Sequence, residues 1–196
     1  MKIAILGWGS LVWQPKELRY DRSFGWKADG PVLPIEFARI SKDGRLTLVI
    51  TVNGTKVPTL YTLSEYTTID EAVLDLAVRE GSGRNSIGSY DKIKNKFFPK
   101  DFICEYEIRE WIGTRDLEGV IWTGLTESWK IKNENRDVIK SINSDDRIDY
   151  LKNLPKPTLA LAEQYVRRTP RQIDTEYRKK IEEELGWFPI EDEKNS

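Results

Sequence analysis

The sequence has no histidine and only one cysteine, Cys104. Because histidine is absent, the chain cannot use the Ser-His or Cys-His systems of nucleophilic catalysis, and it cannot form zinc sites with histidine ligands. One cysteine can form neither a disulfide within the chain nor a cysteine-rich zinc site. We therefore expect Cys104 to be a small buried hydrophobic residue, and the low cysteine content favours a cytoplasmic location.

The sequence also lacks an excess of charge of either sign and lacks a long hydrophobic run. Its 196 residues include 31 Lys and Arg and 32 Asp and Glu, a formal net charge of -1, whereas a dedicated nucleic-acid-binding protein normally has a basic excess. No run of about 18 apolar residues is present, so we expect no membrane-spanning helix. Residues 1–6 are mostly apolar but lead into Gly7-Trp8-Gly9, and we do not read them as a signal peptide. We expect neither nucleic acid nor membrane as a partner, and the oligomeric state stays open.

The order of the patterned segments predicts strands first and helices last. Apolar or alternating runs predict strands at 2–6, 35–40, 46–52, 57–63, 102–108 and 117–125. A capping pattern, Thr68-Ile69-Asp70-Glu71, and an apolar stripe predict a helix that ends at Gly81, followed by a loop at 82–90. Helical spacing recurs at 136–142, 145–154, 159–168 and 175–185. Short turns favour antiparallel pairing, so we predict an α+β fold with a mixed or antiparallel sheet, in one domain over 1–190 with a frayed tail at 191–196.

The first segment of possible chemical interest is Gly7-Trp8-Gly9-Ser10-Leu11, directly after the first predicted strand. It lacks the third glycine of a dinucleotide-binding loop and the Gly-Lys-Ser/Thr of a phosphate-binding loop. Two interpretations are open. The glycines form a structural turn, or consecutive backbone N–H groups of the loop form a concave site for an anion.

The second is Glu80, at the end of the predicted helix. Its spacing from Leu76, Val73 and Ile69 places it on the apolar face of that helix. A carboxylate in an apolar interior is costly unless it is paired or neutralised, and enzymes use such surroundings to tune a glutamate for acid–base work. The structural alternatives are an ion pair with a nearby arginine such as Arg79 or Arg84, or a frayed helix end.

Three segments together resemble the γ-glutamylcyclotransferase-like superfamily. Residues 4–13, Ala-Ile-Leu-Gly-Trp-Gly-Ser-Leu-Val-Trp, are similar to the strand and loop that carry the family's Tyr-Gly-Ser motif. Residues 77–80, Ala-Val-Arg-Glu, and 87–90, Ile-Gly-Ser-Tyr, are similar to the helix end where an Arg-Glu pair precedes a Gly-Tyr segment. The resemblance covers roughly residues 1–125. Trp8 stands where the family usually has tyrosine.

The resemblance implies a six-stranded β-barrel with peripheral helices, its core at about 1–125 and a helical carboxyl-terminal part at about 135–187. It implies an enzyme that needs no metal and no cofactor, in which the α-amine of a γ-glutamyl amine or peptide attacks its own γ-carbonyl and releases 5-oxoproline. Glu80 would be the general acid and base. The substrate-binding residues would be Gly7, Trp8, Gly9, Ser10, Leu11 and Tyr90.

Two other functions stay open. The first is a non-catalytic protein that binds a small amine or amino-acid derivative on the same barrel, with Glu80 recognising an ammonium group. The second is an interaction module that uses the charged helices at 135–185 and leaves the barrel empty. Turnover of γ-glutamyl compounds separates the enzyme from both.

Overall fold

The computed structural model describes residues 1–132, 135 and 137–190; the tail expected at 191–196 lies outside the described residues. Its central element is a five-stranded mixed sheet in the order β5-β1-β8-β6-β7. The strands are β1 (Ile3–Gly7), β5 (Leu60–Leu63), β6 (Ile87–Asp91), β7 (Lys96–Phe98) and β8 (Gly119–Thr123). β1 runs parallel to β8, and the other neighbours are antiparallel.

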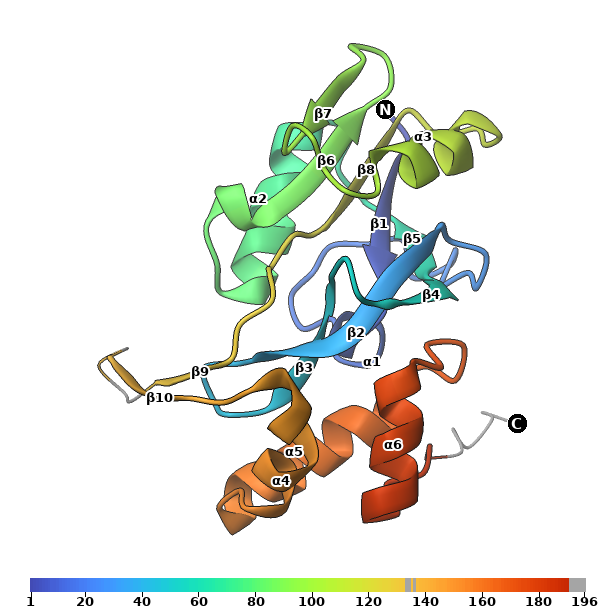
Figure 1. The fold of residues 1–196 in the computed structure, drawn as a ribbon. Helices are drawn as coiled ribbons and strands as arrows, with labels where there is room; N and C mark the ends of the chain where they lie inside the picture. Colours follow the sequence, from blue (N-terminus) through green and yellow to red (C-terminus); the bar gives the residue numbers. More distant parts are fainter. Residues whose placement is uncertain (133–134, 136, 191–196) are drawn as a thin grey trace.

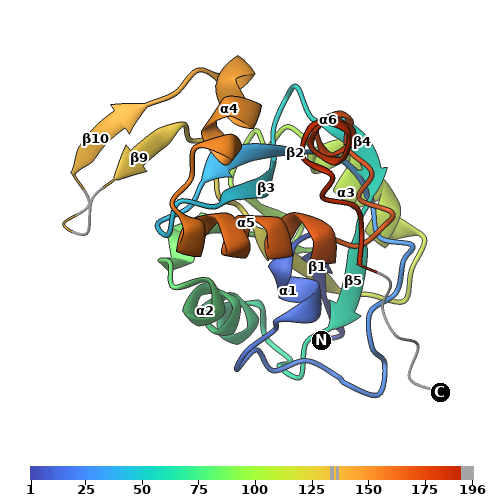
Figure 2. The same cartoon turned by 90° about the horizontal axis from the view of Figure 1, so that it is seen from below.

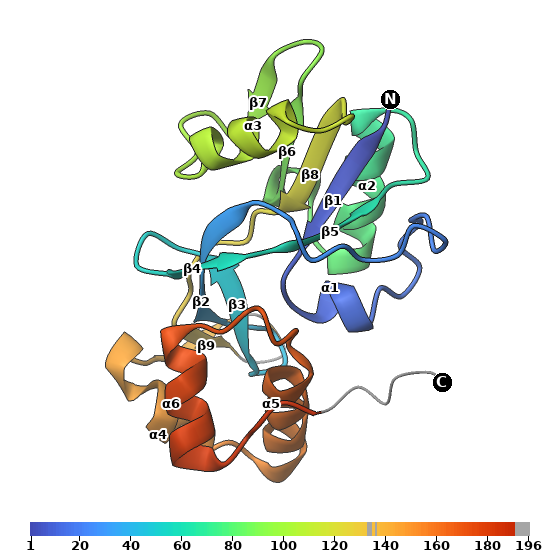
Figure 3. The ribbon, with the colours of Figure 1, turned by 90° about the vertical axis from the view of Figure 1, so that its right-hand side faces the viewer.

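The β1 strand is apolar throughout because both faces of the sheet are covered. Ile3 and Ile5 pack into a cluster with the helix α2 (Ile69–Glu80), whereas Ala4 and Leu6 belong to a larger cluster that includes the helix α3 (Glu105–Gly113). Figure 3 shows α2 and α3 on opposite sides of this sheet. A strand buried on both faces reads as a continuous apolar run rather than an alternating one.

A second, three-stranded antiparallel sheet has the order β3-β2-β4. Its strands are β2 (Val32–Ile40), β3 (Leu46–Ile50) and β4 (Thr55–Pro58). The predicted Asp43-Gly44 turn joins β2 to β3, with Gly44 at a φ of +81°. Pro58 is the last residue of β4, and Thr59 alone separates β4 from β5, so one bent segment connects the two sheets.

The remaining helices lie beside the second sheet. They are α1 (Ser10–Trp13), α4 (Arg147–Lys152), α5 (Lys156–Arg168) and α6 (Glu176–Leu185). Figure 1 places α4, α5 and α6 together below β2 and β3, while the hairpin of β9 (Lys130–Lys132) and β10 (Val138–Ser141) extends away from the body. Two short 3₁₀ turns cover Arg84–Ser86 and Ser144–Asp146.

The α+β class is confirmed, with mixed and antiparallel sheets, but no closed barrel is formed by the strands that the structure describes. The edge strands, β3 and β4 of one sheet and β5 and β7 of the other, each have a single hydrogen-bonded neighbour. An isolated bridge between Arg39 and Ser128 brings the chain after β8 back to β2, without extending into a ladder. The implied six-stranded barrel is therefore not found.

The strand predicted at 102–108 is wrong, since this region begins helix α3. Cys104, Ile108, Trp111 and Ile112 are all buried, and their spacing is that of one helix face. The alternation of apolar and polar residues between 102 and 108 covers less than two helical turns. So short a run cannot distinguish the residue repeat of a strand from that of a helix.

Two other element predictions also differ from the structure. The helix predicted at 136–142 is replaced, in its described part, by β10, whose exposed side chains include Val138 and Ile139. The loop predicted at 82–90 contains β6, which is buried between β7 and β8. Small residues such as Gly88 fit there because a Cβ would collide with the ring of Trp122.

Candidate functional site

A cavity of about 610 Å³ lies between the loop at 7–11, the end of α2 and the β2–β3 hairpin. It is the place where the two motifs singled out in the sequence meet, since residues 7–11 and Glu80 all line it. The helices α1 and α5 border it as well, and Figure 2 shows α1, α2 and α5 next to one another. The remaining lining residues used below are Gln14, Lys16, Arg39, Lys42, Asp43, Arg45, Leu48, Arg79, Gly81, Thr123 and Tyr165.

The loop at 7–11 leaves the central sheet and turns into α1. Gly7 still pairs with Leu60 of β5. Beyond it, the described chain supplies no acceptor for the backbone N–H groups of Trp8, Gly9, Ser10 and Leu11. These four donors have no partner in the described chain, and the residues that carry them line the cavity.

The two glycines of this loop are required by close packing. A Cβ on Gly7 would lie 2.7 Å from the ring of Trp26, and a Cβ on Gly9 would overlap the hydroxyl of Tyr165. The Trp8 side chain is buried, and its indole N–H donates to the carbonyl of Leu48 at 3.4 Å. Trp8 thus attaches the loop to β3. Its side chain forms part of the cavity wall and supplies no hydroxyl group to the cavity.

Glu80 is the last residue of α2, and its side chain is only 14% exposed. One oxygen, Oε1, accepts hydrogen bonds from Arg79 Nη1 at 2.7 Å and from Thr123 Oγ1 at 3.1 Å. Among the described residues, no donor contacts the second oxygen, Oε2. The carboxylate is therefore held in position through one oxygen, while the other has no donor in the described chain.

Arg79 is the arginine partner that the structural alternative for Glu80 required. Its side chain is 5% exposed, and Nη2 donates to Ser10 Oγ at 3.2 Å and to the carbonyl of Gln14 at 2.8 Å. Arg84 instead forms an ion pair with Asp70. Arg79 therefore ties the end of α2 to the glycine loop and α1, which fixes the two halves of the site relative to each other.

Tyr165, on α5, was not singled out by the sequence analysis. It is buried, and its hydroxyl accepts the backbone N–H of Leu48 at 3.2 Å. Burial raises the pKa of Tyr165 to about 12, so the hydroxyl is neutral at physiological pH. No acceptor for its hydrogen exists in the part of the chain that the structure describes, which leaves a neutral donor at the cavity wall beside Gly9.

The hairpin between β2 and β3 adds a set of cations that the sequence analysis also missed. Arg39, Lys42 and Arg45 line the cavity, together with Lys16 from the segment after α1. Arg45 forms an ion pair with Asp43 at 2.8 Å. The spacing of these residues along the sequence gave no signal, because their gathering depends on how the hairpin packs against α2.

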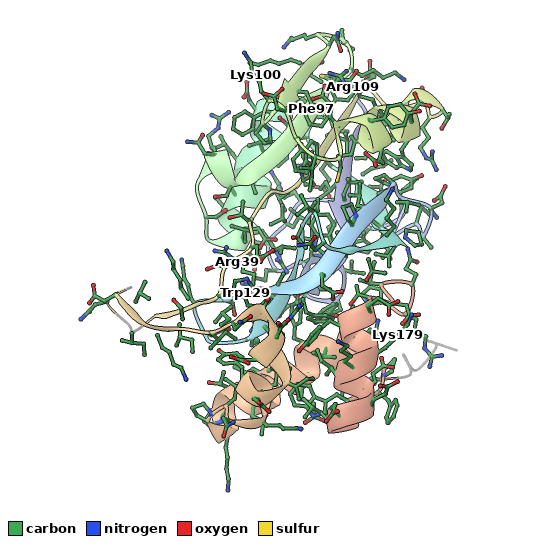
Figure 4. All side chains as sticks on the ribbon, in the orientation of Figure 1. Arg39, Phe97, Lys100, Arg109, Trp129 and Lys179 are labelled. Carbon is green, nitrogen blue, oxygen red and sulfur yellow. The ribbon has the colours of Figure 1, made fainter. Side chains whose placement is uncertain are left out.

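Tyr90 does not line this cavity. It lies on β6, where it is buried, and its ring packs against Phe97 and under the guanidinium of Arg109, 4.3 Å from the ring centre. Figure 4 shows Phe97 and Arg109 near the top of the molecule and Arg39 near its middle. The structure therefore brings residues 7–11 and Glu80 together and leaves Tyr90 elsewhere.

The remaining observations concern Cys104, possible metal ligands and helix length. Cys104 is buried, and burial raises the pKa of its thiol to about 12, as expected for a structural residue. Among the residues that the structure describes, no group of three or more cysteine or carboxylate side chains is placed to hold a metal ion. The same described residues include no helix with the length and apolar character needed to cross a membrane.

Comparisons of the chain with protein-family models, with curated proteins and with solved structures found no match. The resemblance to the γ-glutamylcyclotransferase-like superfamily therefore rests on the sequence motifs alone.

Proposed function

We propose that the protein is a cyclotransferase that converts the γ-glutamyl part of an amine or peptide into 5-oxoproline and releases the free amine. The observation that carries this proposal is the arrangement of Glu80, whose Oε1 is fixed by Arg79 and Thr123 while Oε2 has no donor in the described chain. A carboxylate held in this way is suited to accept and return one proton. The loop N–H groups on the same cavity supply donors for an anionic substrate.

The reaction needs one proton carrier and no protein nucleophile. Glu80 Oε2 takes a proton from the substrate α-ammonium group, and the freed amine attacks the γ-carbonyl carbon, which forms the ring C–N bond. The carbonyl becomes an oxyanion. The ring nitrogen, which now carries two hydrogens and a positive charge, loses one of them to solvent. When the oxyanion collapses, the original amide C–N bond breaks, and Glu80 returns its proton to the leaving nitrogen, so that the lactam and the free amine are formed. Attack within one molecule removes the entropy cost of bringing two reactants together, provided the substrate is held in a folded shape.

The donors of the cavity divide into two roles in this proposal. The N–H groups of the loop at 8–11 bind the substrate α-carboxylate and hold the amine near Glu80. The neutral hydroxyl of Tyr165 donates to the γ-carbonyl oxygen, where negative charge develops. This gives the site a tyrosine hydroxyl from α5, although Trp8 has replaced the tyrosine that the family carries in its loop.

A non-catalytic binding protein is the second candidate function. The ion pair between Glu80 and Arg79, at 2.7 Å with both side chains largely buried, favours it. In that case Glu80 has a structural role or recognises an ammonium group without transferring its proton.

A panel of γ-glutamyl dipeptides, γ-glutamylamines and glutathione, incubated with the purified protein and assayed for 5-oxoproline, separates the two functions. The cyclotransferase proposal expects 5-oxoproline and free amine in equal amounts from at least one compound. A binding protein would raise its melting temperature with a ligand but release no 5-oxoproline. Binding without turnover across the panel would overturn the proposal.

A further inference from the structure

Among the charged side chains that line the cavity, cations outnumber carboxylates. Five are cationic and two are carboxylates, and each carboxylate already has a cation: Asp43 pairs with Arg45, and Glu80 with Arg79. The three cations without an ion pair among the described residues are Lys16, Arg39 and Lys42, which we call the basic rim. A cleft with walls of low dielectric constant concentrates the electric field of such charges and therefore favours anionic ligands.

Two of the three rim cations are placed by specific contacts. A β-bulge between Phe37 and Arg39 shifts the register of β2, so that Phe37 packs in the core while Arg39 lines the cavity. Arg39 is half-buried, and its Nη1 donates to the carbonyl of Thr126 at 2.6 Å. Lys42 Nζ lies 3.5 Å from the carbonyl of Gly81, the residue next to Glu80. Lys42 therefore lies next to the proposed acid–base group, and Arg39 and Lys16 line the same cavity.

The number of these cations indicates how many charges the ligand carries. In the proposed reaction the α-carboxylate of the γ-glutamyl part binds to the loop at 8–11, so the basic rim is left for the part of the substrate that leaves. A neutral amine would leave all three cations of the cavity without an ion pair, and a single carboxylate would leave two. Charge-assisted hydrogen bonds to carboxylates or phosphates are the strong contacts that lysine and arginine make.

We propose that the leaving amine of the substrate carries at least two anionic groups, as in γ-glutamyl-glutamate, and that Lys16, Arg39 and Lys42 bind them. This inference rests on the proposed function because it describes the leaving part of that substrate. It excludes γ-glutamylamines with a neutral or cationic leaving group as preferred substrates.

Glutaryl amides test the inference without turnover, because they lack the α-amine that attacks and so cannot cyclise. Glutaryl-alaninamide, glutaryl-alanine and glutaryl-glutamate differ in the charge of the leaving part, from none to one to two negative charges. We expect calorimetry at low salt to give tighter binding at each step, with glutaryl-glutamate at least about 10-fold tighter than glutaryl-alaninamide, and a smaller ratio at high salt. Equal affinities, or no binding of any of the three, would overturn the inference.

A pair of charge reversals assigns the preference to the rim. Lys42→Glu should remove most of the preference for glutaryl-glutamate over glutaryl-alaninamide. Lys100→Glu changes the net charge equally, but Lys100 is an exposed residue that does not line the cavity and lies near the top of the molecule, away from Arg39 (Figure 4), so the preference should persist. Arg39→Gln should act in the same direction as Lys42→Glu. An equal loss in Lys100→Glu would contradict a local site.

The failure of this inference is distinct from that of the proposed function. Release of 5-oxoproline from γ-glutamyl-alaninamide and γ-glutamyl-glutamate at similar kcat/KM would support the proposed enzyme activity and refute the anionic subsite. Charge-dependent binding of the glutaryl amides, with no 5-oxoproline from either γ-glutamyl compound, would support the anionic subsite and refute the proposed enzyme activity.

Discussion

Glu80 and Tyr165 each use part of their hydrogen-bonding capacity to hold the fold and leave another part free in the described chain. Glu80 Oε1 accepts from Arg79 and Thr123, and the Tyr165 oxygen accepts from the backbone of Leu48. What remains is a carboxylate oxygen and a hydroxyl hydrogen, on one cavity. Residues anchored in this way lose little conformational entropy when a ligand binds, which is the advantage of a preorganised site.

Replacing Tyr165 by phenylalanine tests the role given to its hydroxyl. Tyr165→Phe removes the donor to the developing oxyanion, and we expect turnover to fall by about 100-fold, the usual scale for one such donor. The N–H of Leu48 also loses its acceptor, so the free energy of unfolding should fall by about 1–3 kcal/mol. Steady-state kinetics normalised to the folded fraction, together with denaturant unfolding, measures both effects.

Tyr150→Phe is the matched control. The Tyr150 hydroxyl donates to the carbonyl of Gly44 on the same β2–β3 hairpin, and burial also raises its pKa to about 12, but it does not line the cavity. It should lower stability and leave the turnover of folded protein unchanged. Equal turnover in the two variants would show that the Tyr165 hydroxyl has no role in the reaction.

At the scale of elements, local signals decided which predictions were right. Helix α2 was predictable because its ends are encoded by neighbouring residues: Thr68 accepts the N–H of Glu71, and Gly81 takes a φ of +58°. Helix α3 was not predictable in this way. Cys104 precedes its first residue and makes no side-chain cap, so no local signal marks the start of the helix. The alternation of apolar and polar residues in this region also concealed the helical spacing.

The attachment of α6 depends on a buried carboxylate that no local pattern revealed. Glu36 of β2 is 6% exposed, and its oxygens accept from Thr55, Thr175, and the backbone N–H groups of Phe37 and Tyr177. Thr175 caps α6 and Tyr177 lies in its first turn. A negative charge near a helix N-terminus is favourable, so Glu36 joins α6 to the second sheet.

Glu36→Gln should therefore weaken the fold without affecting the chemistry. The amide NH₂ would face donors instead of accepting from them, and we expect the free energy of unfolding to fall by about 1–3 kcal/mol. Glu176→Gln, in the first turn of the same helix but exposed, should have a much smaller effect because its partner Lys179 is also exposed. Denaturant unfolding of both variants measures this; similar losses would show that the buried network does not stabilise α6.

At the scale of the whole molecule, the sequence predicted part of the site and missed the rest for one physical reason. Glu80 and the loop at 7–11 carry local marks, a position on the apolar helix face and a glycine pair after a strand. Tyr165 comes from α5, and the basic rim comes from the β2–β3 hairpin and the segment after α1; they are brought to one cavity only through long-range packing. The closed barrel implied by the family resemblance also depends on such pairing, and the described strands form separate sheets instead.

The most direct test of the central claim compares 5-oxoproline release by the wild-type protein, Glu80→Gln and Glu182→Gln, each normalised to its folded fraction. The glutamine that Glu80→Gln introduces keeps an acceptor for Arg79 and Thr123 but loses the titratable oxygen. Glu182 is the matched control because it also pairs with a buried arginine, Arg178 at 3.0 Å, away from the cavity. We predict that Glu80→Gln lowers turnover by about 100-fold or more while Glu182→Gln affects only stability. Turnover of folded Glu80→Gln at the wild-type rate would contradict the account.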